Sequence, residues 1–144
     1  MAHEVQSKLI HATAVAWQGR AVLITGASGT GKSALGLQIM AFGGDLVADD
    51  QTILTLRDGA VWASCPPQIA GLIEARFVGI IAAKAVPSAR LALAINMDVT
   101  ESDRMPPERH FDLFGCKVPL LHKVDKPYFP AAILQYLTAG QRLP

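Results

Sequence analysis

The chain has 144 residues, of which 51% are apolar, so it is long enough to form one domain around a buried core. Its 13 basic and 12 acidic residues leave a net charge of +1, which excludes the strong global field that draws a protein onto nucleic acid or an anionic membrane. Residues 1–144 are therefore expected to form a single domain that binds any anion locally.

The sequence also argues against a membrane or secreted protein. The longest apolar tract, residues 69–86, contains Glu74, Arg76 and Lys84, whereas a spanning helix needs about 20 largely uncharged residues. The first residues carry an acid and lack the basic and apolar regions of a secretory signal. The two cysteines are too few for a disulfide scaffold or a Cys-rich zinc site, so we expect reduced thiols in a cytoplasmic protein.

Two strands and a helix are predicted first along the chain. Residues 8–17 and 20–25 are rich in β-branched and apolar side chains, and Gln18 and Gly19 provide a turn between them. Residues 33–42 carry apolar side chains at helical spacing, and the two glycines that follow provide a stop. The order is therefore strand, Gly-rich loop and helix.

The next segment places two carboxylates directly after a strand. Residues 46–48 are a short apolar run that leads into Asp49 and Asp50. Residues 52–56 and 60–62 form a predicted hairpin, because the Asp-Gly pair between them favours a tight turn. We expect the hairpin to be scaffold and the carboxylates to mark a site.

The remaining elements are predicted with simpler patterns. Residues 68–73 are expected to form a short helical or extended segment. Strands are predicted over residues 77–82, 90–97 and 117–123, a surface loop over 100–107, and a helix over 130–138.

One motif indicates the chemistry. The eight residues that match G-x-x-x-x-G-K-[ST] are Gly26, Ala27, Ser28, Gly29, Thr30, Gly31, Lys32 and Ser33. In this pattern the backbone N–H groups converge on phosphate oxygens, the lysine reaches the β- and γ-phosphates, and the hydroxyl ligates magnesium. Because the motif lies between a predicted strand and a predicted helix, it predicts binding of ATP and Mg²⁺.

Transfer of a phosphoryl group needs more than this loop. A carboxylate must orient or deprotonate the acceptor, and cations must neutralise the developing charge. The candidates are His11, Asp49, Asp50, Glu74, Arg76 and Arg104. Each of them also has an ordinary structural interpretation, since a lone histidine or loop arginine is commonly a surface residue.

Several segments resemble the catalytic domain of bacterial HPr kinase/phosphorylase, which acts on a serine of the phosphocarrier protein HPr. The Val-Ala-Asp-Asp segment at residues 47–50 lies shortly after the phosphate loop, as in that family. His11 occupies the place of the family's active-site histidine, and residues 72–81 resemble its Leu-Glu-Ile-Arg-Gly-Leu-Gly-Ile-Ile signature. The resemblance covers most of residues 9–81, and it is to the short alphaproteobacterial form that lacks a separate N-terminal domain.

The resemblance implies an α/β fold, a P-loop-containing mixed sheet with few helices like that of HPr kinase and PEP carboxykinase. It also implies ATP and Mg²⁺ as cofactors, HPr as the substrate and a homohexameric assembly.

Roles for individual residues follow from the same resemblance. Asp50 is implied as the base that takes the proton from the acceptor serine, with Asp49 in support. Lys32 would hold the transferred phosphate, and Ser33 and Glu74 would serve magnesium. The further catalytic residues implied are His11, Arg76 and Arg104, the last from a Ser-Asp-Arg segment at residues 102–104.

Two departures from the family pattern bear on function. Phe77 stands where the signature has glycine, and we expect it to crowd the loop that bears Glu74 and Arg76. Residues 124–130 replace a Pro-Val-Arg-Pro-Gly-Arg-Asn loop that is associated with dephosphorylation, so the phosphorylase activity is not expected.

Two other functions stay open. A small-molecule kinase could use the same phosphate loop, because the acceptor-facing loops do not exclude it. A nucleotide-sensing module without turnover is the other alternative, although binding alone does not require an acceptor base.

Overall fold

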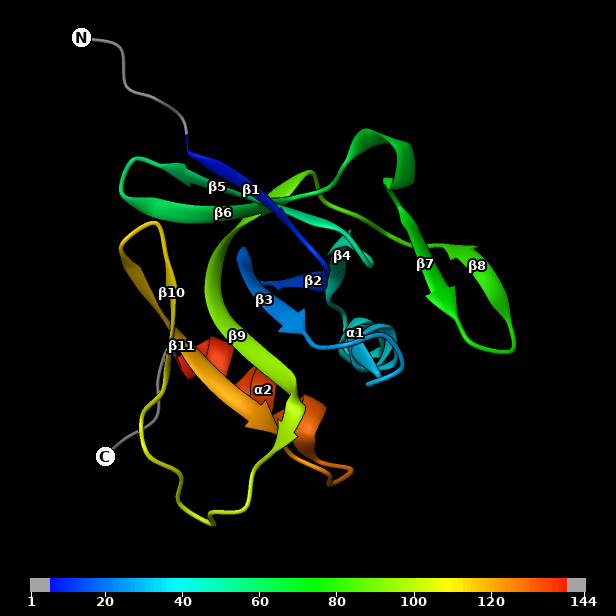
Figure 1. Ribbon diagram of the computed structural model, residues 1–144. Helices are drawn as coiled ribbons and strands as arrows, with labels where there is room; N and C mark the ends of the chain where they lie inside the picture. The colour runs from blue at the N-terminus through cyan, green and yellow to red at the C-terminus, as the bar shows by residue number, and fades with distance from the viewer. Residues whose placement is uncertain (1–5, 140–144) are drawn as a thin grey trace, which may run out of the picture.

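The computed structural model describes residues 6–139, which form a nine-stranded mixed sheet, a two-stranded sheet and two α-helices (Figure 1). The strands of the large sheet are β1 (Ser7–Ile10), β2 (Ala12–Trp17), β3 (Arg20–Thr25), β4 (Asp45–Ala48), β5 (Thr52–Arg57), β6 (Ala60–Ser64), β9 (Ser88–Thr100), β10 (His110–Leu113) and β11 (Cys116–Lys123). The small sheet pairs β7 (Leu72–Ala75) with β8 (Gly79–Ala82), and the helices are α1 (Lys32–Ala41), α2 (Phe129–Ala139) and the short 3-10 helix η1 (Pro67–Ile69).

The long strand β9 organises the large sheet. It runs parallel to β3 on one side, with Thr25 opposite Asn96. On its other side, its first residues pair antiparallel with β6 and its later residues pair parallel with β11. The strand order is β1-β5-β6-β9-β3-β2-β4, with the β10–β11 hairpin attached through β11. The phosphate loop therefore follows a strand that is paired along both edges.

Elements with strong local signals lie where the sequence predicts them. Helix α1 begins one residue earlier than predicted, and Gly43, at φ +110°, follows its C-cap at Phe42. The β5–β6 hairpin turns through Asp58 and Gly59, which both have positive φ as a tight hairpin turn requires. Strand β11 and helix α2 each extend the predicted range by one residue at one or both ends.

Three predicted boundaries were wrong, two because pairing with distant strands sets them and the third because a tight turn at Phe77 and Val78 precedes the strand. The run 8–17 is divided at His11, since β1 pairs with β5 whereas β2 pairs with β3 and β4. The loop predicted over 100–107 begins at Glu101, because β9 continues to Thr100. Residues 77–82 form a strand only from Gly79. Strand β10 has no counterpart among the predicted elements.

The core lies on both faces of the large sheet. Helices α1 and α2 pack together on one face, where Ile39 and Ile133 are fully buried with Val22, Ile24 and Leu93. The other face is lined by small side chains and is covered by the β5–β6 and β10–β11 hairpins, whose buried members include Leu54, Val61, Leu113 and Val118. Many of the buried residues on that face of the sheet are alanines, and their small side chains let the strands approach closely from that side.

Neither helix described in residues 6–139 has the length and apolar character needed to cross a membrane.

Candidate active site

The phosphate loop connects the end of β3 to the start of α1, as Figure 1 shows. Gly26, Gly29 and Gly31 all have positive φ, between 87° and 144°, a conformation that L side chains rarely adopt. The Thr30 hydroxyl donates to the Ala27 carbonyl at 2.7 Å and closes the turn. The loop therefore has the strand-to-helix setting that a phosphate-binding loop requires.

Lys32 is buried at the first position of α1, with 7% of its surface exposed. Its ammonium donates to the carbonyl oxygens of Gly26 and Ala27 at 2.8 and 3.0 Å. Backbone carbonyls are neutral acceptors, so a phosphate oxygen would be a stronger partner for this cation. The loop thus holds a positive charge among its own backbone groups.

Asp49 is the centre of a buried hydrogen-bond network. Its Oδ1 accepts from the hydroxyls of Thr13 at 2.9 Å and Ser33 at 2.6 Å, and its Oδ2 accepts from the Glu74 backbone N–H at 3.0 Å. These donors come from β2, α1 and β7. The carboxylate therefore joins three elements at the phosphate loop.

Asp50 differs from Asp49 in its backbone conformation and in the exposure of its side chain. Its backbone has φ +68°, its carbonyl accepts from Ala12 N–H at 3.0 Å, and 62% of its side chain is exposed. His11 Nε2 lies 3.2 Å from Asp50 Oδ1. The pair is open to solvent, so Asp50 is accessible to an incoming acceptor whereas Asp49 is not.

A cavity of about 410 Å³ brings the predicted residues together. Its walls come from the phosphate loop, the first turns of α1, Asp50 and the β7–β8 hairpin. The predicted site residues that line it are Ser28, Gly29, Gly31, Lys32, Ser33, Asp50, Glu74 and Arg76. Residues that are distant in sequence therefore face one space, beside which Asp49 and His11 lie.

Phe77 and Arg104 do not lie where the sequence-based expectations place them, since neither is in the catalytic cavity. Phe77 does not crowd the site, because its side chain is fully exposed. Its φ of +67° is a conformation that glycine adopts readily, so a phenylalanine there carries backbone strain. Arg104 lies exposed on the loop that follows β9 and does not line the cavity, so its role stays a prediction.

Sequence reasoning did not single out Asp98. Its Oδ1 accepts from the Ala27 N–H at 2.8 Å, and its own N–H donates to the Asn96 side chain at 2.9 Å. Asp98 lies near the carboxyl end of β9, the parallel neighbour of β3. A carboxylate at that position was the available signal, but it becomes meaningful only once the two strands are known to be adjacent.

The oxygen donors of the site fit a magnesium ion that arrives with a nucleotide. In residues 6–139 no group of three or more His, Cys, Asp or Glu side chains is placed to hold a metal ion. Mg²⁺ is commonly bound by one or two carboxylates together with water and substrate phosphates. Ser33 and Glu74, which both line the cavity, match that donor set.

Comparisons with known proteins point to one family. Residues 3–118 match the HPr Serine kinase C-terminal domain. The HPr kinase/phosphorylase of Polaromonas naphthalenivorans is 35% identical over 85 residues, which are 58% of this chain and 27% of that protein. The corresponding protein of Geobacillus thermodenitrificans is 34% identical over 114 residues, or 74% of this chain and 35% of that protein. The chain thus spans roughly a quarter to a third of these relatives.

A solved structure shows the same fold. The HPr(Ser) kinase/phosphatase from Coxiella burnetii superimposes with a TM-score of 0.75 at 26% sequence identity. The match covers 92% of this chain and 89% of that one. The mixed sheet with two helices is therefore the architecture of this family.

Proposed function

The chain belongs to the HPr serine kinase C-terminal domain family, and we propose that it is an ATP-dependent serine kinase of the phosphocarrier protein HPr. We extend the proposal to a single domain over residues 1–144, related in fold to PEP carboxykinase, that acts in the cytoplasm as a homohexamer. Family membership supports the kinase class, and the site geometry supports the residue roles.

The position of Asp50 carries the proposal. A phosphoryl acceptor needs a carboxylate within hydrogen-bond reach of its hydroxyl and near the transferred phosphate. Asp50 is exposed and lines the same cavity as Lys32 and Glu74. A module that only binds nucleotide has no need for such a group at this place.

The two aspartates have different proposed roles because their surroundings differ. Asp50 accepts the proton of the acceptor serine, and His11 at 3.2 Å orients the carboxylate. Asp49 already accepts three hydrogen bonds in a buried position, so it holds the Ser33 hydroxyl and the Glu74 backbone in place.

The phosphate loop and the β7–β8 hairpin supply the remaining groups. Lys32, which now donates to the carbonyls of Gly26 and Ala27, would bind phosphate oxygens, and the loop N–H groups would hold the other phosphates. Ser33 and Glu74 would hold magnesium, and Arg76 would add positive charge at the cavity wall. ATP supplies the phosphoryl group when bound, and Mg²⁺ neutralises its charge.

We also propose that the reverse, dephosphorylating activity is absent. Residues 124–130 read Val-Asp-Lys-Pro-Tyr-Phe-Pro and lack the two arginines of the family segment that is associated with it. Incubation of phosphoserine-HPr with inorganic phosphate should therefore release no pyrophosphate, and its release would contradict this part of the proposal.

The decisive experiment mixes the protein with labelled ATP, magnesium and HPr from the same organism. The intact protein should place label on a serine of HPr, whereas Asp50→Asn should lose at least about a hundredfold in rate, since one general base commonly contributes that much. Nucleotide binding by the variant should stay unchanged, because Asp50 does not belong to the phosphate loop.

Other outcomes separate the alternatives. Label on a small molecule but not on HPr would indicate a small-molecule kinase. Tight ATP binding without transfer to any acceptor would indicate a nucleotide sensor. Equal transfer by the Asp50→Asn variant would remove Asp50 from the mechanism.

A further inference from the structure

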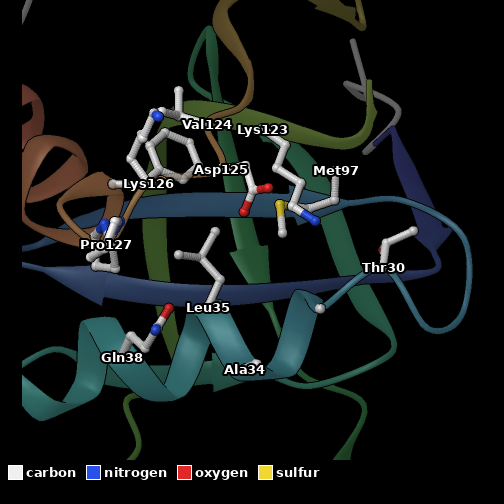
Figure 2. A pocket seen from close by; sticks show the side chains of 13 residues that line it. Thr30, Ala34, Leu35, Gln38, Met97, Lys123, Val124, Asp125, Lys126 and Pro127 are labelled. Carbon is white, nitrogen blue, oxygen red and sulfur yellow. The ribbon is translucent and has the colours of Figure 1, made fainter. Parts of the chain in front are cut away.

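A second cavity lies beside the phosphate loop, and the proposed reaction does not use it. Its volume is about 340 Å³, and Figure 2 shows its walls. One wall comes from α1, with the exposed Ala34 and Gln38 and the largely buried Leu35. The opposite wall is the stretch that leaves β11, from Lys123 to Pro127.

This cavity and the catalytic cavity meet at the start of α1. Gly31 and Ala34 line both of them. On one side are Asp50, Glu74 and Arg76; on the other are Met97 and residues 123–127, 129 and 130. A polyphosphate held by the loop must present its reacting end to Asp50, so the rest of its molecule leaves the loop elsewhere. The second cavity, which is partly open to solvent, lies next to the loop on that other side.

The chemistry of the second cavity suits a nucleoside better than a further phosphate. Figure 2 shows Leu35 and Met97 extending into the space from opposite sides, which provides apolar surfaces for a flat base. Gln38, Thr30 and Asp125 offer hydrogen-bonding groups. Small-ligand sites are commonly about 300–1,000 Å³, mostly apolar and furnished with a few polar groups.

We infer that this cavity binds the base and ribose of the nucleoside triphosphate whose phosphates the loop holds. The inference rests on the proposed function, since it assumes a nucleotide in the phosphate loop. It assigns a task to residues 124–127, which depart from the family pattern: they form one wall of the nucleoside site. Lys123 and Lys126 also line this cavity and give it positive charge.

Calorimetric titration with two ligands tests this assignment without measuring catalysis. ATP and inorganic tripolyphosphate share the phosphates, but only ATP carries a nucleoside. The unmodified protein should bind ATP at least about tenfold more tightly than tripolyphosphate, a difference that the apolar contacts of one base readily supply.

Two substitutions fill the cavity from opposite walls. Gln38→Trp on α1 and Asp125→Trp on the facing stretch should each remove the preference for ATP and leave tripolyphosphate binding within about twofold. Both positions are exposed, so folding should persist, which circular dichroism checks. Ala41→Trp, also exposed on α1 but outside both cavities, is the matched control and should bind both ligands as the unmodified protein does.

The outcomes separate this inference from the proposed function. Equal affinity of the unmodified protein for both ligands, or an intact preference for ATP in both tryptophan variants, would overturn the nucleoside site alone. Failure of both ligands to bind would overturn the phosphate loop assignment and the nucleoside site together. Selective loss of ATP affinity in both variants would support the site whether or not HPr is the acceptor.

Discussion

Two adjacent aspartates in one sequence acquire opposite properties from their surroundings. Asp49 is buried and accepts three hydrogen bonds, whereas the Asp50 side chain is largely exposed and lies beside His11. The tight bend at Asp50, with φ +68°, turns the second carboxylate away from the core. The pair therefore combines a buried structural anchor with an accessible carboxylate, which is the proposed base.

The same substitution at the two positions should separate these properties. Asp49→Asn replaces one acceptor oxygen with an N–H donor that faces other donors, and we expect it to lower the free energy of unfolding by about 1–3 kcal/mol. Asp50→Asn should change it by less than about 0.5 kcal/mol, because the site is exposed and asparagine tolerates positive φ. Urea unfolding of both variants measures the difference, and equal losses would contradict the anchor role of Asp49.

Cys65 is a further residue whose behaviour follows from Asp49. Burial, and then the negative charge of Asp49, raises the pKa of the Cys65 thiol. The thiol therefore stays protonated at neutral pH. Alkylation by iodoacetamide should be slower at Cys65 than at an unstructured cysteine and should accelerate in Asp49→Asn, whereas identical rates in both proteins would show that the charge has no effect.

At the scale of elements, the phosphate loop depends on close packing between β3 and β9. A Cβ added at Gly26 would lie 2.8 Å from Thr30 Oγ1 and 3.0 Å from Met97 Cβ. The loop would have to shift away from β9, and the Ala27–Asp98 hydrogen bond would be lost with it. Loop geometry is therefore set from outside the motif as well as within it.

Gly26→Ala should weaken nucleotide binding by at least about tenfold, since strain of about 1–3 kcal/mol falls on the binding conformation. Gly19→Ala is a suitable control, because Gly19 also has positive φ but an added Cβ meets nothing within 4 Å. The control should lose some stability but no affinity for nucleotide. Calorimetry on both variants tests this, and equal affinities would show that the loop tolerates the shift.

The loop between β9 and β10 is fixed at one end by Glu101. This carboxylate accepts from the backbone N–H groups of Ser102 and Asp103 and from the Arg109 guanidinium. Burial acts to raise the pKa of Glu101, but the hydrogen bonds from Asp103 and Arg109 outweigh it, so the pKa lies below its usual value. The charged form is the one that holds the loop.

A depressed carboxyl pKa contributes stability above the ordinary value and loses it as the pH falls through the folded-state value. Glu101→Gln should therefore be less stable than the unmodified protein at pH 7, and the difference should shrink at pH values below about 4. Thermal unfolding at pH 7 and pH 3 measures both quantities. A difference that stays constant between the two pH values would mean that the charge of Glu101 does not stabilise the loop.

Elements that carry their own signals could be predicted, and those defined by pairing could not. Helix α1 has a loop motif before it and glycines after it, and β5–β6 has an Asp-Gly turn, so both were found. Strand β10 has four residues, His-Phe-Asp-Leu, and exists because β11 pairs with it. The role of Asp98 was hidden for the same reason, since its partner Ala27 is 71 positions away.

At the scale of the whole molecule, one part of the surface exposes several large apolar side chains next to one another in sequence. The β7–β8 hairpin projects from the large sheet (Figure 1), and its residues Phe77, Val78 and Ile80 are each at least 73% exposed. Contiguous apolar residues of this kind commonly mark an interface. The hairpin also carries Glu74 and Arg76, so contacts made there would lie close to the catalytic cavity.

We expect the chain to self-associate through this hairpin, in line with the proposed hexamer. Ile80→Lys should shift the molecular mass in solution toward that of the single chain, because it places a charge in the apolar surface. Met105→Lys, at an exposed residue on the loop after β9, should leave the mass unchanged. Light scattering after gel filtration measures both, and identical masses for Ile80→Lys and the unmodified protein would place the interface elsewhere.

The parallel pairing of β3 with β9 also determines when, during synthesis of the chain, the phosphate loop can take its final conformation. The phosphate loop is synthesised early, but Asp98, which binds its backbone, follows 71 residues later. At about 5–20 residues per second this interval lasts roughly 4–14 s on the ribosome. Until β9 emerges, the glycine-rich loop lacks the strand that supports it, so nucleotide cannot stabilise the growing chain. Stalled nascent chains that expose residues only as far as α1 should therefore bind no ATP. During synthesis, the first half of the chain must avoid aggregation without the stabilisation that bound nucleotide would provide.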